Sequence, residues 1–146
     1  MRTIGSLDAN FAALIAMQAL HSVEEYVGRL WVVFPPATFI TGLISEDRHV
    51  GFVVFNAVLL VFGVWCFIWP IRRRWRNMGG FIAFWVVIEI INGIGHPVWT
   101  ARQGSYTPGL ITAPLLLALA LSLIWQYLRY ARKSELAAER TENSDT

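Results

Sequence analysis

Four long apolar runs constrain the fold of this chain more than any other feature. They cover residues 10–27, 50–70, 79–98 and 109–128. A helix needs roughly 20 mostly apolar residues to cross the hydrocarbon core of a bilayer, and the runs approach this length. Every backbone polar group inside a membrane must be paired within the protein, so the runs predict α-helices. We therefore expect an all-α fold, in which residues 1–133 form one bundle of four transmembrane helices.

The composition agrees with a membrane protein. The chain is 55% hydrophobic and only 15% charged, whereas a soluble domain has about 25% charged residues. The first run is the least apolar, because it contains Gln18, His21, Glu24 and Glu25. A spanning helix tolerates such residues when they face other helices. A cleaved signal peptide is the alternative, and it fits less well because Gln18 interrupts the apolar stretch.

Basic residues predict the orientation of the bundle. Four arginines lie within residues 72–76, between the second and third runs. By the positive-inside rule this loop is cytoplasmic, and both termini then lie on the cytoplasmic side. We interpret the arginines as a topology signal and expect no nucleic-acid partner. The expected location is a bacterial-type inner or plasma membrane. The polar residues 134–146 are predicted to form a disordered cytoplasmic tail.

Polar side chains form a stripe on the first run. Helical geometry places Gln18, His21 and Glu25 within an arc of roughly 60°. Glu24 lies about 60° to the other side of His21. Ionisable groups at bilayer depth are costly and mark functional sites. The first run therefore presents one candidate polar face to its neighbours.

The third run carries a matching stripe. Glu89, Asn92 and His96 share an arc of roughly 60°, and Trp85 extends it one turn inward. Both runs travel outward from the cytoplasmic side, so the two stripes reach the same depth. Asn56 of the second run reaches a similar level, and Gly93 leaves room for close helix approach or for a ligand. We expect one polar layer in the outer half of the bilayer.

The residue types in this layer suit a metal ion. Two or three carboxylates packed without a cation would repel one another. Two histidines and one glutamate form a known zinc set with an open position for water. Bundles that bind two iron or manganese ions use Glu-x-x-His spacing, whereas the order here is His-x-x-Glu. Zinc is favoured, with iron or manganese, including a dinuclear site, as the alternative. A purely structural interpretation also exists, since Glu25 and Arg29 are spaced for a helical salt bridge.

Three motifs resemble the HXXEE family, a group of small four-helix membrane proteins named for the first of them. The motifs are His21-Ser22-Val23-Glu24-Glu25, Asn92-x-x-x-His96 and Tyr106-x-Pro108-Gly109-x-x-Thr112. The resemblance covers roughly residues 14–125. It implies a membrane enzyme of unassigned activity, with one site formed by His21, Glu24, Glu25, Asn92 and His96. Glu89 lies outside the family pattern, so its role depends on the helical geometry alone.

We predict an integral-membrane metalloenzyme that hydrolyses or oxidises a lipidic or otherwise apolar small molecule. The predicted ligands are His21, Glu25 and His96, with Glu89 or Glu24 completing the shell. Glu24 is the expected general base, and Asn92 is expected to orient a ligand or bind a substrate oxygen. Further residues expected at the pocket are Gln18, Asn56, Trp85, Gly93, Tyr106 and Thr112.

Three other functions remain open. A metal-free isomerase of a sterol-like or isoprenoid ligand would use the same histidines and glutamates for proton transfer. A small transporter would need a polar path across the bilayer, and a scaffold would use a metal for stability alone. The lipid bilayer is the expected partner, and a homo-oligomer is compatible with the sequence.

Overall fold

The computed structural model describes residues 5–143, and in this part of the chain the regular structure is helical. The long helices are α1 (Ser6–Val27), α4 (Arg48–Cys66), α5 (Met78–Gln103) and α6 (Ala113–Glu142). Two short helices, α2 (Leu30–Val33) and α3 (Pro35–Ile44), join α1 to α4. A π-helical turn, η1 (Phe67–Ile71), continues α4 and contains Pro70, which cannot donate a backbone hydrogen bond.

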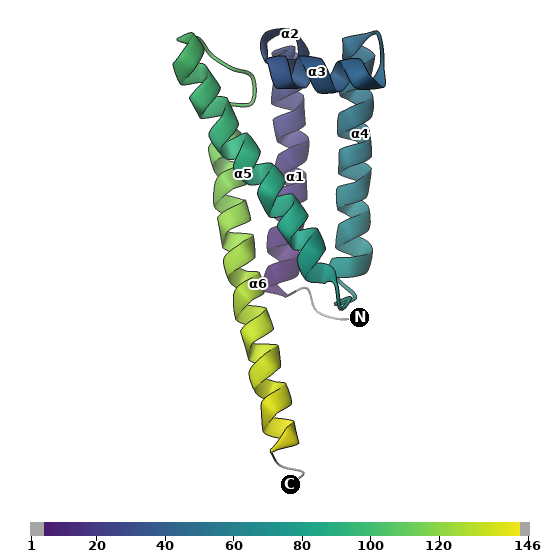
Figure 1. Ribbon diagram of the computed structural model, residues 1–146, viewed down its shortest axis with the longest axis vertical. Helices are drawn as coiled ribbons and strands as arrows, with labels where there is room; N and C mark the ends of the chain where they lie inside the picture. The colour runs from purple at the N-terminus through teal and green to yellow at the C-terminus, as the bar shows by residue number, and fades with distance from the viewer. Residues whose placement is uncertain (1–4, 144–146) are drawn as a thin grey trace.

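The four long helices form a bundle whose upper end is covered on one side by α2 and α3 (Figure 1). Helix α5 starts beside η1 at the foot of α4 and crosses in front of α1 toward α6 (Figure 1). Helices α4 and α5 therefore diverge toward the upper end. This divergence creates the space in which the site lies.

Three helical segments, not four, are long and apolar enough to cross a membrane within the described residues: Arg48–Ile71, Met78–Gln103 and Ala113–Ala137. The remaining predicted span, residues 10–27, corresponds to α1, which has 22 residues and belongs to the bundle. Its length is sufficient, but its sequence carries too many polar and charged groups. Those that are buried, such as Gln18, His21 and Glu25, face the other helices. The expectation of four membrane-spanning helices is therefore corrected to three helices that are apolar enough to span and a fourth, α1, that packs against them with a more polar sequence.

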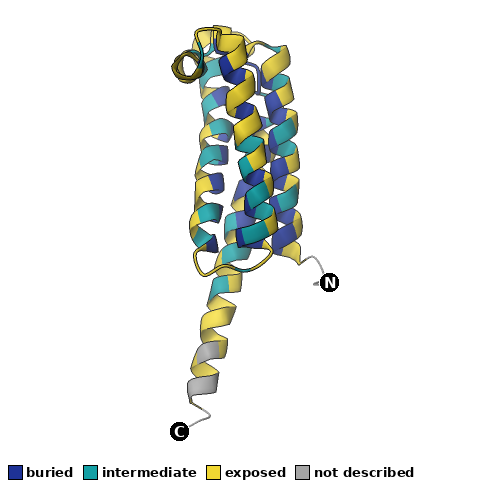
Figure 2. Cartoon of the chain, turned by 90° about the vertical axis from the view of Figure 1, so that its right-hand side faces the viewer, coloured by how far each residue is buried: buried dark blue, intermediate teal, exposed yellow. Residues whose placement is uncertain are grey.

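The outward faces of the bundle are apolar, and the buried faces point inward (Figure 2). Val61 of α4 is 70% exposed, Ile91 of α5 is 64% exposed and Leu121 of α6 is 52% exposed. Such a surface is unfavourable in water, and it matches the hydrocarbon of a bilayer. The fold is thus compatible with a location in a membrane.

The lower half of the bundle contains the main hydrophobic core. Phe11, Leu14 and Leu123 are fully buried there together with Trp85. The Trp85 ring packs against Phe11 edge to face at 6.3 Å between centroids. Trp85 was expected at the pocket, but it belongs to this apolar layer because it lies one turn inward from Glu89.

Helix α6 differs from the predicted fourth run at both ends. It begins at Ala113 instead of residue 109, because residues 108–112 form turns in which Gly109 has a φ of +97°. It continues to Glu142, so the predicted disordered tail is helical through most of its length. Residues 144–146 lie outside the described part of the chain.

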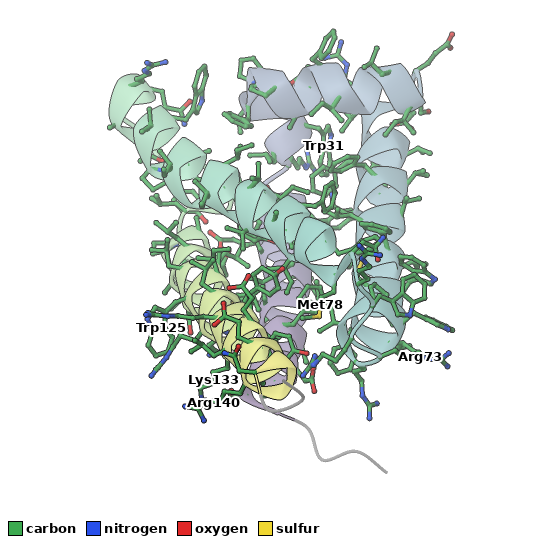
Figure 3. The ribbon with its side chains drawn as sticks, turned by 60° about the horizontal axis from the view of Figure 1, so that its bottom comes forward. Trp31, Arg73, Met78, Trp125, Lys133 and Arg140 are labelled. Atoms are coloured by element: carbon green, nitrogen blue, oxygen red, sulfur yellow. The ribbon has the colours of Figure 1, made fainter. Side chains whose placement is uncertain are left out.

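The lower end of the bundle is basic. Arg73, Lys133 and Arg140 project there (Figure 3), and Arg74 forms a salt bridge with Asp8 at 2.6 Å. The arginine-rich turn after η1, the start of α1 and the end of α6 therefore lie at one end. Which side of the membrane this end faces stays a prediction from the positive-inside rule.

Helices α3 and α4 meet closely at Gly51, where a Cβ atom would clash with the Thr41 carbonyl oxygen. We predict that Gly51→Ala lowers the stability of the purified protein in detergent by about 1–3 kcal/mol, because α3 must move away from α4. Thermal unfolding followed by circular dichroism measures the change. The matched control is Gly42→Ala, where a Cβ meets nothing within 4 Å. Equal stability of the two variants would contradict the close contact.

Candidate metal centre

Helices α1 and α5 bring His21, Glu25 and His96 together. Oε1 of Glu25 lies 3.2 Å from Nε2 of His21 and 3.3 Å from Nε2 of His96. The imidazole rings are 4.8 Å apart between centroids and nearly perpendicular. One ligand atom from each residue lies within 4.8 Å of the others. We call these three residues the His/Glu/His cluster. The sequence-based expectation that the two helices join their imidazole and carboxylate groups is confirmed.

All three side chains of the His/Glu/His cluster are shielded from solvent. His21 is 0% exposed, His96 is 2% exposed and Glu25 is 7% exposed. Burying a carboxylate is costly unless an opposite charge and hydrogen bonds compensate for the lost hydration. The cluster therefore requires a positive charge at its centre, either a proton shared with an imidazole or a metal cation.

The protonation of His21 follows from its other nitrogen. Nδ1 of His21 lies 2.7 Å from the Thr112 hydroxyl, which donates to the Glu24 carboxylate at 2.6 Å. A threonine hydroxyl has a single proton, and a carboxylate only accepts. The Thr112 oxygen must therefore accept a hydrogen bond from Nδ1–H of His21. In the neutral imidazole this leaves a lone pair on Nε2, the atom that faces Glu25.

An acceptor nitrogen that faces a carboxylate oxygen is repulsive without a cation between them. Nε2 of His21 makes no hydrogen bond within the described part of the chain, and the same holds for Nδ1 of His96. Ligand atoms about 2.1 Å from a tetrahedral zinc ion lie roughly 3.4 Å from one another. The 3.2 Å and 3.3 Å separations within the cluster are close to that value. The donor set and these two separations are thus compatible with a single small cation.

Glu24 is placed differently from the prediction. Its carboxylate accepts hydrogen bonds from the Tyr106 hydroxyl, from the Thr112 hydroxyl and from the backbone N–H groups of Ile111 and Thr112. Both oxygens are therefore occupied by the α5–α6 loop. This geometry does not favour Glu24 as a general base or a metal ligand. Glu24 fixes the loop, and through Thr112 it orients His21.

Tyr106 and Thr112, expected at the pocket, belong to this Glu24 contact. Partial desolvation, together with the hydrogen bond to Glu24 and its negative charge, raises the pKa of Tyr106 to about 12. The phenol therefore stays protonated at neutral pH and donates to the carboxylate. Residues of the third motif, Tyr106 and Thr112, thus bind Glu24 of the first motif and fix the α5–α6 loop against α1.

Glu89 lies on α5, the same helix as His96, but it is not a member of the His/Glu/His cluster. Its carboxylate is 0% exposed and accepts a hydrogen bond from Asn92 Nδ2 at 3.2 Å. With the Gln18 amide nitrogen oriented toward it, Gln18 donates to both Glu89 oxygens at 3.1 Å. These contacts engage both carboxylate oxygens. The predicted role of Glu89 as a metal ligand is not favoured by this geometry, and Glu89 orients Asn92 instead.

Two further predicted residues have defined positions. The Asn56 Oδ1 accepts a hydrogen bond from Ser22 at 2.7 Å, so α4 is tied to α1 beside the site. At Gly93 a Cβ atom would lie 2.6 Å from Leu117 Cβ. Gly93 therefore permits close approach of α5 and α6, and provides no space for a ligand.

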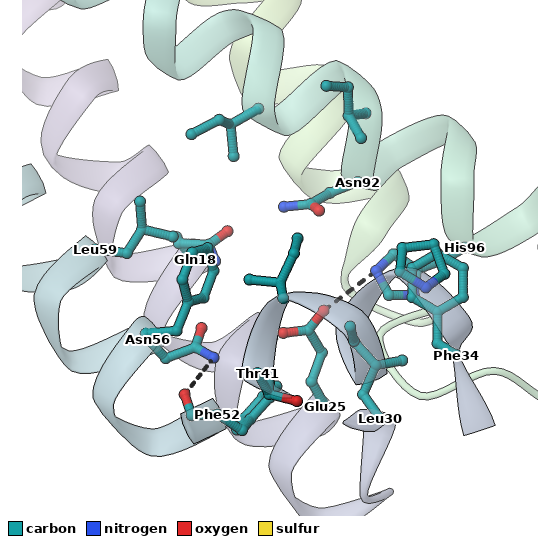
Figure 4. Close-up of a pocket in the computed structure, with 16 residues that line it drawn as sticks. Gln18, Glu25, Leu30, Phe34, Thr41, Phe52, Asn56, Leu59, Asn92 and His96 are labelled. Atoms are coloured by element: carbon teal, nitrogen blue, oxygen red, sulfur yellow. Dashed lines mark hydrogen bonds and ion pairs between the residues drawn. The ribbon is translucent and has the colours of Figure 1, made fainter. Parts of the chain in front are cut away.

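A cavity of about 250 Å³ adjoins the His/Glu/His cluster between α1, α3, α4 and α5 (Figure 4). Its polar lining residues are Gln18, Glu25, Thr41, Asn56, Asn92 and His96. Its apolar lining includes Leu30, Phe34 and Phe52, and the Phe34 ring stacks on the His96 ring at 5.7 Å. Leu30 and Phe34 were not predicted as site residues. They lie in the segment between the first two apolar runs, and its position over the bundle could not be inferred from helical periodicity.

Gly109 is a second position that sequence analysis did not assign. A Cβ atom there would lie 2.6 Å from Cε1 of His96 and 2.8 Å from Cε1 of His21. Its φ of +97° also favours glycine. The backbone of the α5–α6 loop therefore passes directly against both imidazoles. The Pro108-Gly109 pair in the third motif was the available signal.

The family comparison agrees with these motifs. The chain belongs to the family described as "Protein of unknown function with HXXEE motif", whose model matches residues 12–124. The matched segment contains the His/Glu/His cluster, Glu24 and the α5–α6 loop. No curated protein and no solved structure matches the chain.

The hydrogen bond from His21 to Thr112 predicts the tautomer of His21. We expect the neutral ring of the wild-type protein, in the absence of metal, to carry its proton on Nδ1, and Thr112→Val to abolish this preference because it removes the acceptor. The ¹⁵N chemical shifts of the two ring nitrogens report the tautomer. Thr112→Ser keeps the hydroxyl and is the matched control. A ring protonated on Nε2 in the wild-type protein would contradict the assignment.

Proposed function

We propose that the protein is a metal-dependent membrane enzyme whose metal is bound by His21, Glu25 and His96. The observation that supports this most directly is the lone pair on His21 Nε2, which faces the Glu25 carboxylate at 3.2 Å in a buried position. Thr112 and Glu24 maintain this arrangement from outside the cluster. Metal-binding histidines commonly donate their second N–H in this way, which fixes the ring orientation.

Zinc is the preferred metal for this donor set. Two imidazole nitrogens and one carboxylate oxygen leave the fourth tetrahedral position open, as in catalytic zinc sites. Glu25 and His96 also line the cavity, so the open position has a place for a substrate next to it. A dinuclear iron or manganese site would need further carboxylates. Glu24 and Glu89 are both engaged in other hydrogen bonds, which favours a single ion.

Hydrolysis of a lipidic or apolar small molecule is the proposed reaction, and oxidation is the alternative if iron is bound. A bound divalent ion would supply a Lewis acid and lower the pKa of a coordinated water. Asn92, held by Glu89, would bind an oxygen of the substrate. Gln18 and Asn56 supply further amide groups in the cavity, and the apolar walls exclude bulk water.

The proposed location of this reaction is the outer half of the membrane. Arg73, in the turn between η1 and α5, lies at the lower end of the bundle (Figure 3), whereas His21 and Glu25 lie toward the other end of α1. The positive-inside rule assigns that end to the cytoplasm. The apolar core at the lower half of the bundle, which includes Phe11 and Ile82, supports an enzyme over a transporter.

A metal-free isomerase is the second candidate, because one Glu25 oxygen contacts both imidazoles and could hold a shared proton there. A scaffold with a structural metal is the third candidate. Protein that binds no metal would favour the isomerase. Cobalt-substituted protein whose visible spectrum does not change when a hydroxamic acid is added would favour the scaffold, because its metal would have no open coordination position.

Metal content tests the proposal. We predict about one zinc ion per chain in protein purified in detergent and dialysed against a zinc buffer, measured by elemental analysis. His21→Ala, Glu25→Ala and His96→Ala should each lose most of it, because each removes one of three ligands. His49→Ala is the control, since His49 contacts Tyr26 at 3.0 Å on the exposed surface. Wild-type protein that binds no more zinc than a variant with all three alanine substitutions would contradict a metal centre.

A backbone variant tests whether both imidazoles bind one ion. Gly109→Ala places a methyl group against His21 and His96, and we expect it to lower zinc affinity about tenfold to a hundredfold, as loss of outer-shell positioning does. A competition titration with a zinc-binding dye measures the affinity. Gly104→Ala is the matched control, because Gly104 has a φ of +65° but a Cβ there meets nothing within 4 Å. Equal losses in both variants would show backbone strain alone.

A further inference from the structure

Apolar residues of two candidate membrane helices line part of the cavity beside the His/Glu/His cluster: Phe55 and Leu59 of α4, and Ile88 and Ile91 of α5. Phe55 is 39% exposed and Ile91 is 64% exposed, so the lining reaches the outer surface of the bundle at these two residues. We take the stretch between Phe55 and Ile91, called the mouth below, as the opening of the cavity toward lipid.

The cavity also has a polar part. The amides of Gln18, Asn56 and Asn92 line it together with Glu25 and His96 (Figure 4). Asn92 uses its Nδ2 group to donate to Glu89, so its Oδ1 atom remains able to accept a hydrogen bond. The lining thus combines amide groups that suit a small polar group with apolar side chains that suit hydrocarbon.

The charges of the lining select the polar group. Among the described residues that line the cavity there is no lysine or arginine. Phosphate and carboxylate head groups are normally bound by cationic side chains, and the described lining of this cavity supplies none. Amide groups instead suit an uncharged hydroxyl, ester or amide, because they both donate and accept hydrogen bonds.

The size of the cavity limits the apolar part of a bound ligand. A volume of about 250 Å³ is smaller than the roughly 300–1,000 Å³ of pockets that enclose a drug-sized ligand. It holds a polar group and the first part of one chain. A longer chain must leave through the mouth, where Phe55 and Ile91 already face the bilayer. A ring system as wide as a sterol would have to separate α4 from α5.

We propose that this cavity binds one uncharged, single-chain amphiphile taken directly from the membrane, of the class of a long-chain alcohol or its ester. Its polar group lies at Asn92 beside the His/Glu/His cluster, and its chain passes between Phe55 and Ile91 into the bilayer. This inference names the substrate class of the proposed function and rests on it for the chemistry, although binding itself needs no reaction.

Photolabelling tests the binding site. The full chain is placed in phosphatidylcholine nanodiscs with a long-chain alcohol that carries a diazirine near its hydroxyl end. We expect adducts in residues 52–59 and 88–92, found by mass spectrometry, and their loss when unlabelled alcohol is added in excess. The phosphate-bearing single-chain lipid lysophosphatidic acid should not compete. Adducts spread evenly over the lipid-facing residues of α4, α5 and α6 would overturn the proposal, and so would equal competition by both lipids.

Three variants locate the ligand. Asn92→Leu should reduce competable labelling about fivefold to tenfold, because it removes a hydrogen-bond partner of the polar group. Ile91→Trp should reduce it by a similar factor by narrowing the mouth. Ile94→Trp is the matched control and should label as the wild type does, because Ile94 is 52% exposed on the same helix but does not line the cavity. Equal labelling of all three variants would overturn the proposal.

The same samples separate this inference from the proposed function. Zinc content is measured in each sample alongside the labelling. Competable labelling of the cavity in a protein that binds no zinc would sustain the lipid site and refute the metal enzyme. Stoichiometric zinc without competable labelling would do the reverse. Asn92→Leu should keep its zinc, since Asn92 is not a member of the His/Glu/His cluster.

Discussion

The arrangement of the whole molecule depends on one buried carboxylate that faces two imidazoles. Glu25 is 7% exposed, and one of its oxygens lies within 3.3 Å of both His21 and His96. A carboxylate in this position is tolerated only if a cation or shared protons neutralise it. The same contact joins α1 to α5, two helices that are otherwise separated along the chain by the whole of α4. Structure and chemistry at this point are therefore inseparable.

The two glutamates of the family motif have different tasks, because adjacent residues on a helix point in directions about 100° apart. Glu25 faces the cluster, whereas Glu24 faces the α5–α6 loop and binds Thr112 and Tyr106. The Thr112 hydroxyl then holds His21 from behind. The first and third motifs thus form one hydrogen-bonded unit. In it Glu25 supplies a negative charge to the cluster, and Glu24 orients His21 through Thr112.

The apolar core and the polar site occupy different halves of the bundle. Its lower half contains the apolar core with Trp85, whereas its upper half contains the polar cluster and the cavity. Divergence of α4 and α5 leaves space that α2 and α3 cover only from above. The composition of α1 follows the same division, since its buried polar residues face the other helices whereas Leu20 and Val23 on its outward face are apolar and exposed.

The sequence alone determined the helical class, three apolar spans and the meeting of His21, Glu25 and His96, because helical periodicity and membrane depth fix the face and level of each residue. It also predicted a fourth membrane-spanning helix, which the composition of α1 does not support. The roles predicted for Glu24 and Glu89 depend on which neighbours their side chains meet, and only the tertiary structure shows those neighbours. The turns before α6 bring Thr112 to Glu24, and the amides of Gln18 and Asn92 donate to Glu89. The position of α3, which lines one side of the cavity, likewise depends on its close contact with α4 at Gly51 and Thr41, which the periodicity of the apolar runs does not specify.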